Sequence, residues 1–382
     1  MEDKKIKKIL LAHLNSNGDC LYSTVIAKQI KEVDYPNAHL TWAVNSKCLQ
    51  SVLLNPYVDK IWDVPTASLL TTYDEWESFV KEAERRKQIG EFDKIFYTQI
   101  IGKSTLLFDG GIRSTTYLQY PHKITVSQQP IIRLSLDEVE TVKQFAEKYR
   151  LNKFKNVLLV ECGPDSFKST LNPQTAKEIA DKLTINDPSL AVILSSNKKI
   201  ENTNAQIIDG SILSFRANAE LTKYCTLFAG CSSGISWLTT TDWAKPLPKI
   251  ILVNKDNYYN SSMLYDHKYA KLPFDNIIEI TETQNSALVL LECLTIIIND
   301  SFLKSKKIFH SEFKLTNFKF FKDILFLNKH NGNHAALFSS TNNIIKRNGF
   351  RWKPILLFLK TFFKLPIYFF KYKKRIDPII NK

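Results

Sequence analysis

The fold is decided near the start of the chain, by Ile9-Leu10-Leu11-Ala12-His13-Leu14-Asn15-Ser16-Asn17-Gly18-Asp19. Residues 6–14 predict a buried strand, and the polar stretch from Asn15 to Asp19 predicts a glycine-containing loop after it. Residues 21–33 repeat apolar side chains at helical spacing, which predicts a helix. A strand, a short loop and a helix in this order are typical of a parallel sheet with helices on its faces.

The same alternation continues through the first half of the chain. Further strands are expected at residues 39–44, 58–62 and 94–98, with helices at 47–54 and 74–88 between them. A loop that carries Gly110, Gly111 and Arg113 follows the last of these strands. Strands that alternate with helices form parallel, doubly wound sheets.

A second series begins after a helix expected at residues 136–149. It contains strands at 157–160, 191–194 and 226–229, helices at 172–183, 219–224 and 235–240, and a closing strand at 250–253. The sequence therefore predicts an α/β protein with two Rossmann-like, doubly wound parallel-sheet domains. The expected divisions are residues 1–150, residues 151–300, and a carboxyl-terminal extension over residues 301–382.

Length and cysteine usage agree with a cytoplasmic two-domain protein. The chain has 382 residues, enough for two domains of ordinary size. Six cysteines occur without a Cys-x-x-Cys pair or a Cys/His cluster, so neither a zinc site nor a disulfide framework is indicated. The apolar run from Ile9 to Ala12 is too short for a signal peptide or a spanning helix.

The positive charge of the chain is concentrated at its carboxyl end. Residues 345–382 carry eleven Lys or Arg against the single acid Asp377, so they contribute +10 of the net charge of +14. Large apolar and aromatic side chains alternate there with cations, and Pro354 and Pro366 interrupt any helix. This pattern predicts an interfacial anchor on an anionic membrane, here the inner face of the cytoplasmic membrane.

Two other interpretations of this basic tail remain open. It can wrap back onto the first domain, with its aromatic side chains in that contact. Basic residues with aromatic neighbours also bind nucleic acids, but the remainder of the chain carries only +4 and offers no continuing basic stripe. Nucleic acid is therefore not an expected partner.

The loop after the first strand contains the first candidate for chemistry. Ligands bind at the carboxyl ends of strands in open parallel sheets, which is where Asn17, Gly18 and Asp19 are expected. Gly18 permits a close approach of the backbone to a ligand, and Asp19 is placed to accept a proton. From geometry alone, Asp19 could equally well only cap the following helix.

Residues 9–62 resemble the amino-terminal half of the heptosyltransferase-like (family 9) glycosyltransferases, which have the GT-B architecture. The resemblance is carried by Asn15-Ser16-Asn17-Gly18-Asp19, Tyr35-Pro36-Asn37 and Asn55-Pro56-Tyr57-Val58-Asp59. It implies that Asp19 is the general base that deprotonates an acceptor hydroxyl. The resemblance extends over about residues 5 to 255.

Two loops of the second half match the family's donor-binding loops. The resemblance implies that Lys168, with Ser169 beside it, contacts the donor diphosphate, and that the loop ending in Ser232, Ser233 and Gly234 binds phosphate at a helix amino terminus. Without the resemblance, Lys168 would be taken for a solvated lysine and the serine-glycine loop for an ordinary tight turn.

The chain departs from the family pattern at two positions of the second loop. Ser232 stands where the family has an aspartate, and Trp237 stands where it has a histidine. These departures concern the donor sugar, so a donor other than a heptose is an alternative.

No Asp-x-Asp motif occurs, so no metal or other cofactor is expected. The resemblance implies a metal-independent, inverting transfer. His13 is an alternative base with a suitable ordinary pKa, although a lone histidine at a strand end is more often packed. Arg113 is a candidate for binding an anionic acceptor, but its spacing is not diagnostic.

The resemblance as a whole implies an enzyme that uses a nucleotide-sugar donor. The acceptor would be a glycan or glycolipid of bacterial type, as in the biosynthesis of lipopolysaccharide or capsule, at the cytoplasmic membrane. The alternative from a different class is a catalytically silent, membrane-associated scaffold that keeps the GT-B fold.

Overall fold

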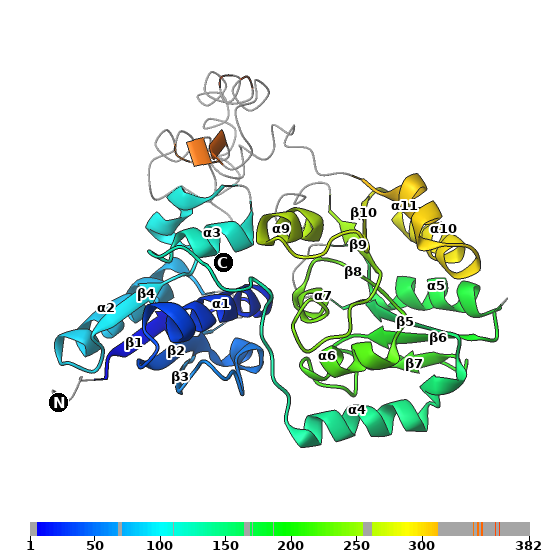
Figure 1. Cartoon of the computed structure of the whole chain (residues 1–382). Coiled ribbons are helices and arrows are strands. Elements are labelled where there is room, and N and C mark those ends of the chain that lie inside the picture. Colours follow the sequence, from blue (N-terminus) through cyan, green and yellow to red (C-terminus); the bar gives the residue numbers. More distant parts are fainter. Residues whose placement is uncertain are drawn as a thin grey trace.

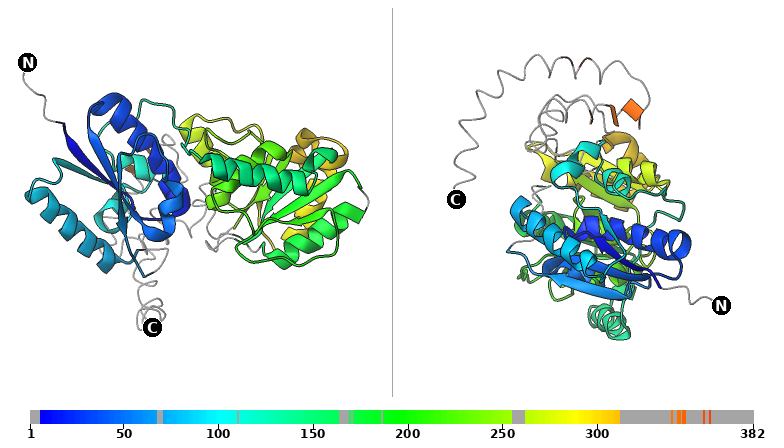
Figure 2. Two further views of the ribbon diagram at one scale, coloured as in Figure 1. Left: turned by 90° about the horizontal axis from the view of Figure 1, so that it is seen from below. Right: turned by 90° about the vertical axis from the view of Figure 1, so that its left-hand side faces the viewer.

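The computed structural model describes residues 6–67, 71–109, 111–163, 169, 171–185, 187–254 and 262–311, and the single residues 339, 342, 343, 345, 346, 356 and 359. In these residues two parallel sheets, each flanked by helices, lie side by side (Figures 1 and 2). The predicted α/β class with two doubly wound sheets is confirmed. Lys168 and most of the basic tail lie outside the described residues.

The first sheet has the strand order β3-β2-β1-β4. All its strands run parallel, and Leu10 in β1 pairs with Thr41 on one side and Ile95 on the other. The chain therefore moves outward from β1 to β3 and then returns to the other side of β1. Sheets of this kind bind ligands in a crevice outside the carboxyl ends of their strands, at such a reversal. The strands are β1 (Lys8–Ala12), β2 (His39–Asn45), β3 (Lys60–Val64) and β4 (Lys94–Tyr97).

Helices cover both faces of this sheet, and the first of them begins earlier than predicted. The amide of Cys20 donates to the carbonyl of Ser16 at 2.8 Å, so Asn17, Gly18 and Asp19 form the first turn of α1 and not a loop. Arg113 likewise lies in a helix and not in the predicted loop. The helices are α1 (Asn17–Gln29, continued by π-helix over Ile30–Asp34), α2 (Tyr73–Gln88) and α3 (Ile112–Leu118), with 3-10 turns at Ser46–Ser51 and Gly102–Leu107.

The second sheet has the order β10-β9-β8-β5-β6-β7, all parallel. The prediction that residues 250–253 close this sheet was wrong, because β10 pairs beyond β9. The buried Glu279 interrupts the apolar pattern of β10, and β7 has only three residues, so neither strand was predicted. The strands are β5 (Asn156–Glu161), β6 (Leu190–Ser195), β7 (Ile207–Asp209), β8 (Leu227–Gly230), β9 (Lys249–Val253) and β10 (Ile277–Thr281).

Helices on either side of the predicted boundaries pack with the second sheet. α4 (Leu136–Lys148) contacts α6 (Ala217–Leu221), and α11 (Phe302–Phe309) contacts both α10 (Ser286–Asn299) and β10. Figure 1 shows α4 along the lower side of the second unit. Helices α4 and α11 therefore pack with elements of the second sheet, and we call residues 136–311 the second unit. The remaining helices of this unit are α5 (Pro173–Ile185), α7 (Gly234–Leu238) and α9 (Met263–Ala270).

Two described residues of the carboxyl-terminal extension contact the first unit. The hydroxyl of Ser339 and the side-chain amide of Asn343 both donate to the carbonyl of Leu106, at 2.8 and 3.0 Å. Leu356 and Leu359 are exposed. Within the part of the chain that is described, no helix has the length and apolar character needed to cross a membrane.

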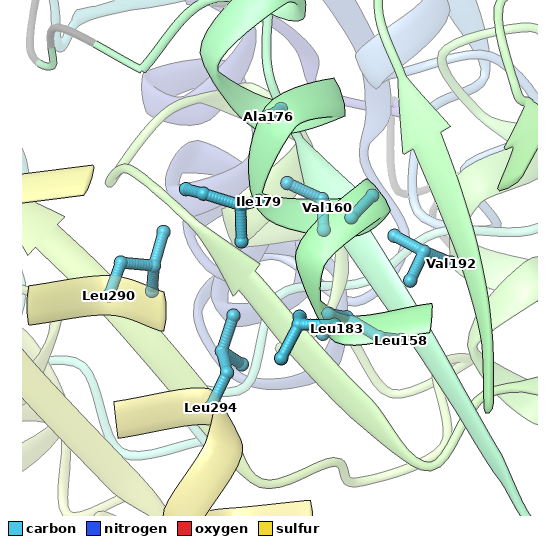
Figure 3. A pocket seen from close by; sticks show the side chains of 9 residues that line it. Leu158, Val160, Ala176, Ile179, Leu183, Val192, Leu290 and Leu294 are labelled. Carbon is cyan, nitrogen blue, oxygen red and sulfur yellow. The ribbon is translucent and has the colours of Figure 1, made fainter. Parts of the chain in front are cut away.

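The outer core of the second unit is an apolar seam between α5, α10 and the sheet (Figure 3). Side chains of both helices and of β5 and β6 line it, and it leaves no room for a bound water molecule. Its character is that of packed core and not of a ligand site. The lining residues are Leu158, Val160, Ala176, Ile179, Ala180, Leu183, Val192, Leu290 and Leu294.

We predict that Leu294→Ala lowers the free energy of unfolding by about 2–5 kcal/mol, because it opens a cavity in this seam. Leu294 is fully buried, whereas Leu288 on the same helix is 53% exposed. Chemical denaturation of both alanine variants measures the difference. An equal effect of Leu288→Ala would show that the loss comes from helix propensity and not from packing.

Candidate active site

The carboxyl edge of the first sheet is fixed by buried polar contacts. The side-chain oxygen of Gln99 accepts hydrogen bonds from the amides of Leu14 and Asn15, both at 3.0 Å. Nδ1 of His13 lies 3.1 Å from the hydroxyl of Thr98. These contacts tie the end of β1 to the residues after β4, and so they set where α1 begins.

Asp19 lies in the first turn of α1, directly after this edge. It is half-buried, and Gly18 beside it is buried. Asn17 is held by a hydrogen bond of 3.0 Å that its side-chain oxygen accepts from Ser51. The positive end of the helix dipole stabilises a carboxylate in this turn. The structure therefore presents an acidic side chain at the crevice that the strand order creates.

The corresponding edge of the second sheet carries a buried carboxyl group. Glu161, at the end of β5, accepts a hydrogen bond of 2.6 Å from the hydroxyl of Ser236 and further bonds from the amides of Cys231, Ile235 and Ser236. Burial raises the pKa of Glu161 to about 7, and these hydrogen bonds oppose the rise. Glu161 thus caps the short helix α7 from the neighbouring strand.

This cap bears on the predicted phosphate loop. Ser232 and Ser233 are both buried, and three amides around them are held by Glu161. A phosphate group bound here would have to use other donors than these three. The loop ending at Gly234 is therefore shaped by the protein's own carboxyl group.

The two edges meet directly. α1 contacts α7, and Figure 1 shows the two helices facing each other between the sheets. A Cβ atom on Gly18 would lie 3.0 Å from Cδ1 of Trp237, and one on Gly234 would lie 3.2 Å from Cβ of Asn17. The structure thus brings Asn17 and Gly18, predicted in one loop of the first half, next to Gly234, predicted in a loop of the second half.

A cation lies among aromatic rings beside this contact. The rings of Tyr22 and Trp237 meet edge to face with centroids 4.7 Å apart. The guanidinium of Arg113 lies 4.4 Å from the centroid of Tyr22 and 5.3 Å from that of Trp237. Arg113 is fully buried, and it donates to the carbonyl of Gln128 at 3.2 Å. In this structure it is part of the contact between the units and does not face an open pocket.

His13 is entirely buried. Burial lowers its pKa to about 4, against smaller opposing contributions from hydrogen bonds, so the ring is neutral at neutral pH. A buried neutral imidazole has no access to an acceptor hydroxyl. The geometry therefore favours the packed interpretation of His13 over its interpretation as a base.

Ser169 lies at the carboxyl edge of the second sheet. Its hydroxyl donates to Glu282, just after β10, at 2.6 Å and accepts from the amide of Leu171 at 3.0 Å. The preceding residue, Lys168, which was predicted to contact the donor diphosphate, lies outside the described residues. Among the residues that the structure describes, no three His, Cys, Asp or Glu side chains are grouped closely enough to hold a metal ion.

Arg216 joins the two units at a second place, in addition to the contact between α1 and α7. The sequence analysis did not identify this residue. Its guanidinium pairs with Glu138 of α4 at 2.6 Å and donates to the carbonyls of Gln50 and Leu53, at 2.8 and 3.0 Å, and of Arg133. Arg216 is buried. It therefore connects the second unit to the first unit and to the segment between them.

The charge of Glu138 depends on this contact. Burial acts to raise its pKa, but hydrogen bonds from Arg216 and Ser135 outweigh burial and hold the pKa below its usual value. Glu138 also completes a capping box with Ser135 at the start of α4. The Ser-x-x-Glu spacing signals that cap in the sequence, whereas nothing in the sequence signals its distant partner.

Comparison with solved structures places this fold among glycosyltransferases. A family 9 glycosyl transferase from Veillonella parvula DSM 2008 aligns with a TM-score of 0.52 and 12% identity, over 89% of this chain and 97% of that one. The ADP-heptose LPS heptosyltransferase II of E. coli aligns with a TM-score of 0.49 and 14% identity, over 78% and 99%. No known family profile and no curated protein matches the sequence.

At these identities the similarity concerns the fold. The chain has the two-domain GT-B architecture of the family 9 structure, and it spans nearly all of that structure's length. The resemblance that the sequence motifs indicated is therefore confirmed at the level of fold.

We predict that Glu161→Gln changes how stability depends on pH. The folded-state pKa of about 7 lies above the usual 4.5, so between these values the folded protein binds more protons than the unfolded chain. Stability of the wild type therefore loses up to about 1.4 kcal/mol per pH unit in this window through Glu161. The variant lacks this loss, so its stability relative to wild type should rise from pH 4.5 to pH 7 and then level off.

Denaturation midpoints across this pH range measure the effect. The buried neutral histidines act with the opposite sign, but they cancel in the difference between variant and wild type. The exposed Glu140 provides the control, since Glu140→Gln should leave the profile unchanged. Parallel profiles for wild type and Glu161→Gln would contradict the prediction.

We predict that Arg216→Ala lowers the free energy of unfolding by about 3–5 kcal/mol, because Glu138 and several carbonyls lose a buried partner. Arg85→Ala removes an ion pair with Glu82 in which Arg85 is more than half exposed, and should cost much less, because water screens the pair. Urea denaturation of both variants tests the prediction. Equal losses would mean that the contact of Arg216 between the units adds nothing.

Proposed function

We propose that this chain is a glycosyltransferase, which moves a sugar from a nucleoside-diphosphate sugar to a hydroxyl group of a glycan or glycolipid. The observation that carries the proposal is the position of Asp19, in the first turn of α1 at the strand-order reversal and opposite α7 of the second unit. The GT-B fold, shared with a family 9 glycosyl transferase, supports the same chemistry.

In the proposed reaction the carboxylate of Asp19 takes the proton of the acceptor hydroxyl. The acceptor oxygen then attacks the anomeric carbon as the bond from that carbon to the diphosphate breaks, and the nucleoside diphosphate leaves. Attack opposite the leaving group inverts the anomeric carbon. A base in hydrogen-bond reach of the hydroxyl contributes about 10²–10⁴-fold to such a step.

The donor would bind mainly at the carboxyl edge of the second sheet. Charge that develops on the departing diphosphate needs positive groups or amide donors near it. Lys168 is the proposed cation, next to Ser169, and the loop at Ser232 and Ser233 is the proposed amide source. The absence of an Asp-x-Asp motif from the sequence supports a transfer in which protein groups, and not a metal ion, meet this charge.

One observation favours a second candidate function. Trp237 stands at the position where the family pattern has a histidine. Its indole lies against Gly18, the residue before the proposed base Asp19. A bulky apolar ring there supports either a donor sugar other than a heptose or a catalytically silent scaffold with the same fold. A silent scaffold would bind a nucleotide or a membrane without transferring a sugar.

We also propose that the protein acts at the inner face of the cytoplasmic membrane, in the assembly of a bacterial surface glycan such as lipopolysaccharide or capsule. The basic and aromatic composition of residues 345–382 supports this location, because such segments bind anionic lipid. The contacts of Ser339 and Asn343 with Leu106 hold the chain just before this segment on the first unit, where a glycolipid acceptor would bind.

We predict that one of ADP, GDP, UDP, CDP and CMP raises the thermal unfolding temperature, because a ligand of the folded state stabilises it. Asp19→Asn should keep this shift and lower the release of nucleoside diphosphate from the matching nucleotide sugar about 10²–10⁴-fold, with a membrane glycolipid extract as acceptor. The asparagine keeps the size of the side chain and removes its basicity.

Asp137→Asn supplies a matched control, because Asp137 also lies in the first turn of a helix but is exposed on α4. It should leave turnover unchanged. A nucleotide shift without turnover in the wild type would favour the silent scaffold. No shift with any of the nucleotides would count against a standard donor and against the proposed function.

A further inference from the structure

Helix α11 is docked on the second unit by one face only. Phe302 and Phe309 pack against the outer core. Ser305 between them is fully buried, and its hydroxyl donates to the carbonyl of Cys293 in α10 at 3.0 Å. After the helix, the amide of Ser311 donates to the carbonyl of Glu279 at 2.7 Å, which ties the chain to β10. The helix is therefore a fixed part of the fold.

The opposite face of α11 combines large apolar and positive side chains. Leu303 is 69% exposed and Ile308 is 56% exposed. Lys304 and Lys307 are also exposed and stand at helical spacing from them, so all four share the outer face. We call these four residues the α11 face. The helix contains no acid, although Asp300 just before it pairs with Lys304.

Single exposed apolar residues are common on soluble proteins and need no explanation. The α11 face differs because two large apolar side chains are exposed within one turn and a half and are interleaved with lysines. Long lysine stems can lie along an apolar surface while their charges reach polar headgroups. This combination is the one that interfacial helices use on anionic membranes.

The described residues of the extension lie toward the same end of the molecule. Figure 1 and the right-hand view of Figure 2 show α11 and the described residues between positions 339 and 346 at the upper end of the two units. Lys346, Leu356 and Leu359 are also exposed. The extension and α11 thus expose the same two kinds of side chain, lysines and large apolar residues.

We propose that the α11 face is a docking surface for an anionic lipid bilayer, and that it holds the second unit against the membrane. The inference rests on the proposed membrane location, and it adds a contact that belongs to the folded body and not to the tail. Leu303 and Ile308 enter the headgroup boundary, and Lys304 and Lys307 face the lipid phosphates. Two separate contacts, on the two units, then fix the orientation of the protein on the surface.

Flotation of the full chain with vesicles tests this surface. Wild type should bind vesicles of phosphatidylglycerol mixed with phosphatidylcholine, and bind pure phosphatidylcholine much more weakly. L303S/I308S should lower the partition coefficient about tenfold or more. K304Q/K307Q should lower it about fivefold for each lysine, and this part should vanish at high salt.

The matched control is L136S/I185S, which replaces two exposed apolar residues at 88% and 75% exposure on α4 and at the end of α5. It should bind vesicles like the wild type. Equal binding by the α11 variants and the wild type would overturn the proposal. So would loss of self-association, measured by sedimentation, with lipid binding unchanged, because the face would then be a protein interface.

The outcome can be separated from that of the proposed function. The α11 variants should keep the nucleotide-dependent thermal shift, since the face lies away from α1 and α7. If the wild type binds anionic vesicles through this face but transfers no sugar, the docking surface stands and the enzymatic proposal fails. If nucleotide binding and transfer persist while vesicles are not bound, the docking surface is wrong and the enzyme stands.

Discussion

The arrangement of this protein depends on a steric constraint where α1 meets α7. Gly18 lies against the indole of Trp237, and Gly234 lies against the ring of Phe215 and the side chain of Asn17, where a Cβ atom would come within 2.9 to 3.2 Å of them. The absence of two Cβ atoms therefore allows the helix ends to touch. Because each helix begins at the strand-order reversal of its own sheet, this contact makes the two crevices face each other.

Buried charged groups around this contact differ in their surroundings, and among the residues that the structure describes, Nε and Nη2 of Arg113 have no hydrogen-bond partner. Glu161 is surrounded by four donors from α7 and the loop before it, so it shapes the loop while its pKa stays high. Arg216 is paired with Glu138 and with backbone carbonyls of the first unit. Arg113 has aromatic faces on two sides instead.

Much of the fold follows from local patterns. The apolar runs of β1 and β5 and the Ser-x-x-Glu start of α4 are each decided within a few residues, and they appear close to where the sequence puts them. Strand β10 was missed because Glu279 breaks its pattern. That acid is explained only by the helix it caps, since Ser262 and the amide of Leu264 donate to it. Glu279 is required by a tertiary contact, so no local sequence pattern could predict a strand that contains it.

The same limit applies to the candidate site. Asp19 could be singled out because a strand, a loop and a helix surround it in the sequence. The proximity of Trp237 to Gly18 could not be predicted, because the two residues lie far apart in the sequence. They meet only through the packing of α1 on α7. Sequence motifs indicate which residues stand at a sheet edge, and only the fold decides which edges meet.

The units contact each other at Arg216 and at Trp237, and these two places differ in the interactions that separation of the units would break. At Arg216, separation of the units would break two hydrogen bonds from a buried side chain to the carbonyls of Gln50 and Leu53 in the first unit. At Trp237, it would part an aromatic contact and expose Arg113 to water, and hydration of that guanidinium would offset part of the cost. Separation at Trp237 would also break the buried hydrogen bond of 3.4 Å from the hydroxyl of Tyr22 to Asp266, so both places hold the units together.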